Sequence, residues 1–142
     1  MRCYAVIDTN VLISAVISKK SDAAAVKVLR KVFDGSICPI YNSKILEEYN
    51  EVLRRPKFHL QEQTVAVVIS AIKQFGVELN PTTSSETMID EDDRIFLDTA
   101  IAFEGSFMVT GNMKHFPNKS FIVTPREMLE IINDYFEKDG EA

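Results

Sequence analysis

Three carboxylates that lie far apart in the sequence occupy positions from which an α/β fold could build a catalytic site. Asp8 ends the first apolar run, Glu48 lies within the third expected helix, and Asp93 lies in the first turn of the fifth. Carboxylates brought close together raise one another's pKa, and a divalent cation among them relieves that repulsion. Oxygen ligands alone suit Mg2+ or Mn2+ rather than zinc. Such an ion supports hydrolysis of a phosphodiester, which is the chemistry these positions indicate.

The helical period indicates which way the second carboxylate points. At ~100° per residue, Glu48 falls at the edge of the apolar stripe, on the row of Ile45 and Val52. Glu47 points to the opposite side of the helix. A carboxylate at the margin of a buried face needs a partner or a metal ion. The alternative for Glu48 is a carboxylate that reaches solvent from the helix margin, and the alternative for Asp8 is a helix cap.

The third carboxylate, Asp93, points in the direction of the core side chains of its helix, but from the first turn, at the rim. Asp92 and Asp98 lie well off that direction. The positive end of the helix dipole partly stabilises an inward carboxylate at this position. Asp90 and Asp92 are best explained as acids placed at a helix N-terminus, and the same explanation is the alternative for Asp93.

Neutral polar side chains accompany the acids at two strand ends. Asn10 follows the first acid closely, and Thr110 and Asn112 follow the fourth expected strand. Gly111 between them lets the backbone approach closely. We expect these side chains to add neutral oxygen atoms to the rim, with turn formation by Gly111 and Asn112 as the alternative explanation.

Short apolar runs alternate with segments of helical period along the chain. Strands are expected at 3–7, 37–40, 77–79, 106–109 and 121–123. Helices are expected at 9–17, from 21 or 22 to 33, and at 43–55, 61–75, 92–104 and 125–136. This alternation predicts an α/β sandwich in which helices pack around a parallel sheet. In such folds the sites lie beyond the carboxyl ends of strands, which here means the loops after Ile7, Ile40 and Val109.

The composition excludes several other classes of protein. The 142 residues carry a formal net charge of −5, which argues against a generic surface for polyanions. The length predicts a single domain at 1–137, followed by a frayed C-terminal tail at 138–142. No apolar run approaches the ~18–20 residues of a membrane span. Cys3 and Cys38 have no metal-ligand spacing, and we expect two reduced thiols in a cytoplasmic protein.

The chain resembles the PIN domain family, in the subgroup of toxin components of toxin–antitoxin systems, along nearly its whole length. The resemblance is carried by AVIDTNVLIS at 5–14, SKILEEY at 43–49, DEDDRIFL at 90–97, VTGNMKHFP at 109–117 and the ending TPRE at 124–127. Each motif is short, but their order and spacing together are specific.

This resemblance implies a three-layer sandwich with a central five-stranded parallel sheet flanked by helices. It implies a ribonuclease that depends on Mg2+ or Mn2+, with Asp8, Glu48 and Asp93 as the acids that hold the metal and act in catalysis. The supporting polar residues that it implies are Asn10, Thr110 and Asn112, with Asp92 and Asp90 as further acids.

The chain departs from the family at one position of the site, and the resemblance also implies two kinds of protein partner. Many members have Asp where this chain has Asn112, so a second metal ion should bind less well here, and we expect activity that is weak, that uses one metal ion, or that is lost. Many such toxins bind a small antitoxin protein and form homodimers, and we expect both of this chain.

Three cations near the end of the third expected helix are candidates for contact with RNA. Arg54, Arg55 and Lys57 stand beside Phe58, and this combination suits phosphate contacts and a stacked base. A solvated helix end is the alternative explanation for each cation.

Two other functions are alternatives to a metal-dependent endoribonuclease toxin. A catalytically weak or silent PIN-fold module that binds RNA or protein is favoured by Asn112 and by the net negative charge. An aspartate-nucleophile phosphatase needs a second acid two residues after Asp8, where Asn10 stands instead. The histidines, His59 and His115, lack nearby nucleophile motifs and are expected on the surface and in a loop.

Overall fold

A computed structural model of the chain describes the backbone of residues 2–141 and the side chains of residues 2–136. Five strands form one sheet in the order β3-β2-β1-β4-β5, and each neighbouring pair is parallel. The strands are β1 (Cys3–Ile7), β2 (Ile37–Tyr41), β3 (Val77–Glu78), β4 (Phe107–Val109) and β5 (Ile122–Val123). The predicted five-stranded parallel sheet is therefore confirmed.

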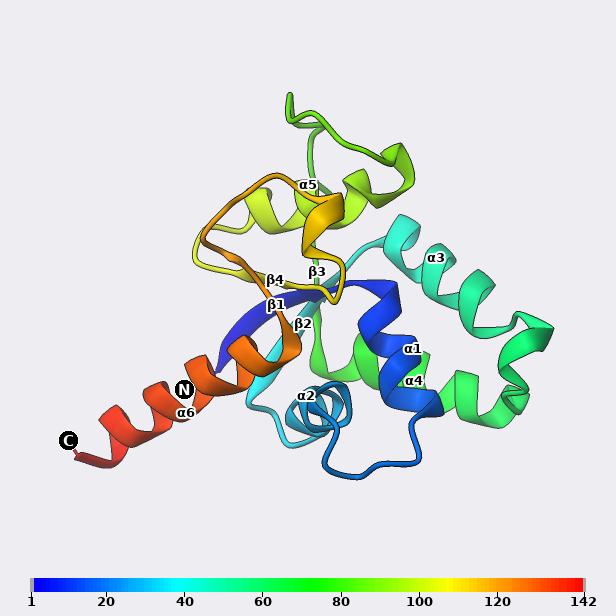
Figure 1. Cartoon of the computed structure of the whole chain (residues 1–142), viewed down its shortest axis with the longest axis horizontal. Coiled ribbons are helices and arrows are strands. Elements are labelled where there is room, and N and C mark those ends of the chain that lie inside the picture. The colour runs from blue at the N-terminus through cyan, green and yellow to red at the C-terminus, as the bar shows by residue number, and fades with distance from the viewer. Residues whose placement is uncertain (1, 142) are drawn as a thin grey trace.

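Helices cover both faces of this sheet and complete three layers. They are α1 (Thr9–Ile17), α2 (Ala24–Phe33), α3 (Ser43–Leu53), α4 (Glu62–Phe75), α5 (Arg94–Ala102) and α6 (Pro125–Glu141). Figure 1 shows α5 on one side of the strands, with α1, α2 and α4 on the other. The α/β sandwich expected from the alternation of strands and helices is confirmed.

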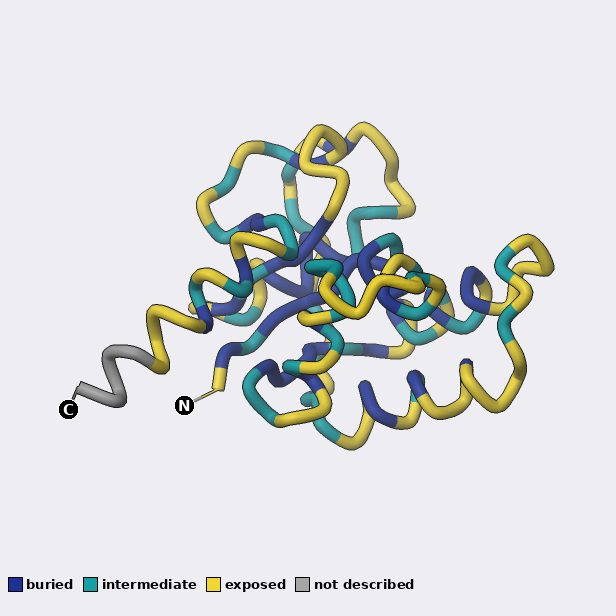
Figure 2. Tube along the Cα trace, turned by 60° about the horizontal axis from the view of Figure 1, so that its bottom comes forward, coloured by how far each residue is buried: buried dark blue, intermediate teal, exposed yellow. Residues whose placement is uncertain are grey.

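The core lies around β1, the central strand. Figure 2 shows the strands as the buried centre of the molecule, with exposed backbone at its margins. Tyr49 of α3 is fully buried, packs with its ring tilted against that of Phe96 of α5, and donates a hydrogen bond from its hydroxyl to the Ile7 carbonyl oxygen at 2.5 Å. This contact ties α3 to the carboxyl end of β1, and so places the residue beside it, Glu48, next to the residue that follows Ile7.

Several helix boundaries differ from those expected. The second helix begins at Ala24, and the third ends at Leu53, before the short 3-10 turn η1 (Pro56–Phe58). The helix expected from residue 92 begins at Arg94, after the 3-10 turn η2 (Glu91–Asp93). Asp90 explains the last shift, because its side chain accepts a hydrogen bond from the Asp92 backbone N–H at 3.0 Å and tightens this turn.

The last helix begins as the sequence predicts. The Thr124 N–H donates to the Glu127 carboxylate, and the Glu127 N–H donates to the Thr124 hydroxyl, which is a capping box. The helix continues to Glu141, beyond the end expected at residue 136. The tail expected at 138–142 falls where side chains are not described, so the domain boundary stays a prediction. Among the described residues, no helix combines the length and apolar character that a membrane crossing requires.

Candidate active site

The strand order reverses between β1 and β4. The chain runs outward from β1 to β2 and β3, then returns to place β4 on the other side of β1. Ligand sites in parallel α/β sheets lie beyond the carboxyl ends of the strands at such a switch point. Asp8 follows β1 and Thr110 follows β4, so the two residues meet at this position.

Asp8 is a buried carboxylate that is held in place from the neighbouring strand. The Thr110 hydroxyl donates to Asp8 Oδ2 at 2.7 Å and accepts the Asn112 N–H at 3.0 Å. The Asp8 N–H donates to the Val109 carbonyl oxygen at 2.9 Å, which extends the pairing of the two strands. Asp8 stands at the N-cap position of α1, but its side chain makes no capping hydrogen bond. Its carboxylate is therefore oriented by β4 rather than by the helix.

A cleft of about 230 Å3 brings the three acids together. It is lined by Asp8, Thr9, Asn10, Ile13, Glu48, Val52, Arg55, Asp90, Asp93, Asn112 and His115. Glu48 is half-buried and Glu47 is exposed, as the helical period predicts. Of the supporting residues, Asn10 also accepts the Gly111 N–H at 3.3 Å, which links the loops after the two strands. Asp92 lines the neighbouring cavity instead.

The acids of the cleft disfavour one another's ionised forms. Burial raises the pKa of Asp8, and the charge of Glu48 raises it further. Burial also raises the pKa of Asp93 to about 6, with Asp8 and Asp90 adding to the effect and His115 opposing it. Burial is the largest cause that raises the pKa of Glu48, and the charges of neighbouring acids, Asp93 among them, raise it further. A cation in the cleft would relieve this repulsion.

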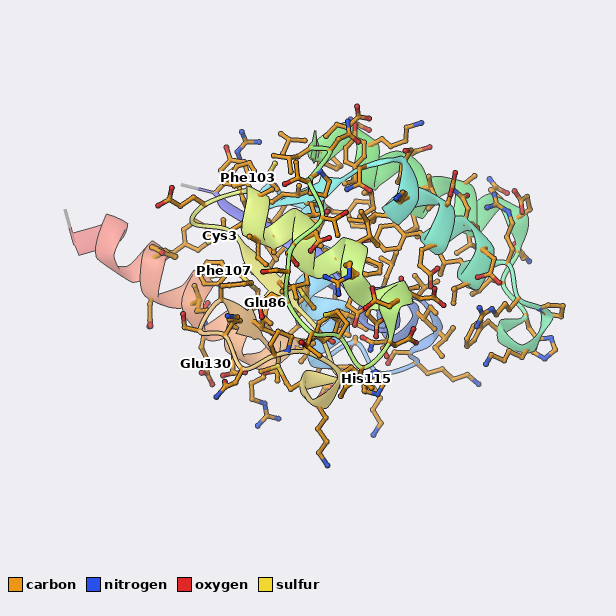
Figure 3. The ribbon with its side chains drawn as sticks, turned by 90° about the horizontal axis from the view of Figure 1, so that it is seen from above. Cys3, Glu86, Phe103, Phe107, His115 and Glu130 are labelled. Atoms are coloured by element: carbon orange, nitrogen blue, oxygen red, sulfur yellow. The ribbon has the colours of Figure 1, made fainter. Side chains whose placement is uncertain are left out.

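Two residues of the cleft were not found from the sequence. The first is His115, which lies on the 3-10 turn η3 (Met113–His115). Its Nδ1 atom is 3.6 Å from Asp93 Oδ2. Figure 3 shows His115 on this turn, beside the loop that leads into α5. The second residue is Thr9, whose hydroxyl oxygen is the one buried side-chain polar atom without a hydrogen bond in the described part of the chain. Each residue lies within one of the motifs that carry the resemblance, Thr9 at 5–14 and His115 at 109–117, and these motifs are the sequence signal that could have indicated them.

The three predicted RNA-binding cations differ in their positions. The Arg54 guanidinium is paired with Glu62 of α4 at 2.6 Å. Arg55 is paired with Glu51 at 3.0 Å and lines the cleft. Lys57 is exposed, and its ammonium lies over the ring of Phe58. Arg55 is thus the cation of this group that the structure places at the candidate site.

The donor atoms of the cleft fit a hard divalent cation in type. Carboxylates and neutral side-chain oxygens are the main ligands of such a cation, and both kinds line the cleft. Thr9, whose hydroxyl has no hydrogen-bond partner, is a further oxygen-bearing residue of the lining. Within the described residues, however, no three His, Cys, Asp or Glu side chains are gathered closely enough to hold a metal ion as they stand. Metal binding would have to draw the carboxylates of the cleft together.

Comparison with known families agrees with the fold. The PIN domain family model matches residues 4–114, which include all three acids. The chain therefore belongs to the PIN domain family, whose members are generally nucleases. A comparison with curated protein sequences gives no match.

Proposed function

We propose that this chain is a metal-dependent endoribonuclease that hydrolyses RNA phosphodiester bonds. Asp8, Glu48 and Asp93 are assigned as its metal-holding and catalytic residues. The observation that carries the proposal is the meeting of these three distant acids in one cleft at the switch point of the sheet. Their raised pKa values support it, because perturbed pKa values cluster at functional sites and a bound cation would relieve the repulsion among these acids.

The residues of the chain divide the work of the site. When bound, Mg2+ or Mn2+ would lower the pKa of the attacking water and neutralise charge at the phosphate. Asp8, fixed by the Thr110 hydroxyl, supplies an oxygen whose direction is already set. Glu48 of α3 and Asp93 of η2 supply further oxygens to the same cleft, and Arg55 places a guanidinium where a substrate phosphate can meet it.

The biological role that we propose is that of the toxin in a toxin–antitoxin pair. A small antitoxin protein would bind the chain and suppress the nuclease, and the active form would be a homodimer. These parts of the proposal rest on the resemblance of the motifs to toxin components of the family. Co-purification of the chain with the product of an adjoining small open reading frame would test the pairing.

The nuclease activity is tested by incubating a mixed RNA pool with the purified chain in Mn2+ or Mg2+. We expect internal cleavage by the wild type, none by Asp8→Asn, and normal cleavage by Glu47→Gln. Glu47 is a matched control because it is an exposed acid on the same helix as Glu48. Equal cleavage by the wild type and Asp8→Asn would show that the assigned acids are not the active site.

A second candidate function is a catalytically weak or silent module that binds RNA or protein. It is favoured by the neutral Asn112 at the cleft and by acids that are not gathered at ligand distance. RNA binding without cleavage, together with no uptake of Mn2+ at millimolar concentration, would establish this function in place of the nuclease.

A further inference from the structure

A second cavity adjoins the cleft and takes no part in the chemistry described above. It has a volume of about 300 Å3, at the small end of the roughly 300–1,000 Å3 that ligand pockets occupy. It is lined by Lys44, Glu48, Pro81, Thr83, Glu91, Asp92, Arg94, Ile95 and Asp98. Glu48 lines both hollows, and the adjacent residues Asp92 and Asp93 line one each. The cleft and this cavity are therefore neighbours.

One wall of the cavity is held in place by Arg94. Its guanidinium donates to the carbonyl oxygen of Ser84 at 3.0 Å and to that of Glu86 at 2.7 Å, while it pairs with Glu91 at 2.6 Å. Figure 3 shows Glu86 on the loop that passes over α5. These bonds fix the loop against α5 without a ligand, so binding costs little ordering of the chain.

Asp98 is the buried polar group of this cavity. Its side chain lines the cavity although the residue is only 4% exposed, and its Oδ1 atom accepts the Ser84 N–H at 3.2 Å. Within the described residues, no hydrogen bond reaches its Oδ2 atom. This oxygen is not itself fully buried, because Thr9 holds the one buried side-chain polar atom without a partner in the described part of the chain. It is thus open to the cavity, and a ligand that brings N–H groups could donate to it.

The charge of the cavity selects against a phosphate. Four carboxylates and two cations line it, and one of these cations, Arg94, is already paired with Glu91. The surface therefore repels an anion and favours a neutral group rich in donors. Pro81 and Ile95 add apolar surface for a flat ring, and the exposed ammonium of Lys44 can donate to a carbonyl oxygen.

We propose that this cavity binds a guanine base of the RNA substrate, next to the phosphodiester that is cut. The proposal rests on the ribonuclease function proposed above. Guanine offers two neighbouring donors, N1–H and the 2-amino group, to the Asp98 carboxylate, and its O6 atom accepts from Lys44. Adenine and cytosine set an amino group beside a ring acceptor, and uracil sets one N–H between two carbonyls. Guanine is therefore the base whose edge the cavity matches.

The proposal is tested by calorimetric titration of the chain with the nucleosides guanosine, inosine, adenosine, cytidine and uridine, in EDTA. Nucleosides carry no phosphate, and EDTA removes any cleavage. We expect guanosine to bind about tenfold more tightly than inosine, which lacks the 2-amino group, and than the other three. Equal binding of all five nucleosides, or of none, would overturn the proposal.

Variants locate the binding within the cavity. We expect Asp98→Asn to remove the preference for guanosine, and Glu47→Gln, at an exposed acid that lines neither the cavity nor the cleft, to keep it. Lys44→Met serves if Asp98→Asn does not fold, because Lys44 is exposed and its loss should weaken guanosine binding severalfold. Unchanged preference in both Asp98→Asn and Lys44→Met would overturn the proposal. So would Mn2+ binding that Asp98→Asn abolishes, since the cavity would then be a cation site.

Mapping of cleavage ends separates this proposal from the function on which it rests. If the wild type cuts beside guanosine and Asp98→Asn cuts without regard to the base, both the nuclease function and the guanine site are supported. Cuts with no base preference would leave the nuclease standing and overturn the guanine site. Guanosine binding by a chain that cuts no RNA would support the site and refute the nuclease.

Discussion

Replacing Asp93 by Asn should stabilise the metal-free protein at pH 7. The carboxylate has a pKa of about 6 in the folded chain, against 3.8 for an ordinary aspartate, because burial and the charges of Asp8 and Asp90 disfavour ionisation. At about 1.4 kcal/mol per unit this shift has an upper bound of about 3 kcal/mol. The side chain is 22% exposed and solvent screens part of the repulsion, so we expect a gain of about 1–2 kcal/mol.

The stability gained in Asp93→Asn should depend on pH, in a direction that the raised pKa of Asp93 sets. The pKa of Asp93 is higher in the folded state, so its contribution to stability is fully present below pH 3.8 and is lost as the pH rises through about 6. The advantage of Asp93→Asn should therefore be full at pH 7 and should vanish near pH 4. The neighbouring His115 contact does not reverse this, because the histidine is about half exposed and its ion pair contributes little.

Urea unfolding in EDTA at pH 4, 5.5 and 7 measures the effect. Glu47→Gln is the control, since this exposed acid on α3 should change the free energy of unfolding by less than about 0.5 kcal/mol at each pH. A loss of stability in Asp93→Asn at pH 7, or a gain of the same size at all three pH values, would refute the electrostatic reasoning.

Two further substitutions test the supports of the site. Asn112→Asp should tighten Mn2+ binding about tenfold, because it adds a carboxylate at the cleft; unchanged affinity in calorimetry would exclude residue 112 from the metal site. Tyr49→Phe should lower the free energy of unfolding by about 1–3 kcal/mol, because the Ile7 carbonyl oxygen loses its buried donor; urea unfolding with no change would show that this contact does not hold α3 to β1.

Two of the three acids, Asp8 and Glu48, have positions that a regular element sets, whereas Asp93, expected on a helix, lies on η2. The run before Asp8 is apolar and too short for a helix, which places the acid at a strand end, and the structure buries that strand. The position of Glu48 follows from the helical period, because Ile45 and Val52 on the same side are buried. Periodicity thus sufficed wherever a side chain's direction depends on its own helix or strand.

The parts that the sequence did not predict depend on irregular segments and distant partners. Asp98 points away from the sheet, as its helical position indicates, yet it is buried because the loop through Ser84 covers that side of α5. Arg54 is engaged by Glu62, which belongs to the next helix. His115 reaches Asp93 through the turn that follows β4. Hydrophobic periodicity in the sequence does not indicate these contacts, because they depend on the path of the loops and on how the helices pack.

Calorimetric titration with Mn2+ tests most directly whether the cleft is a cation site built from three acids. We expect the wild type and Glu47→Gln to bind Mn2+, and Asp8→Asn, Glu48→Gln and Asp93→Asn each to lose most of that affinity. Binding that survives all three substitutions, or no binding by the wild type at millimolar Mn2+, would contradict the assignment of the cleft as a metal-dependent nuclease site.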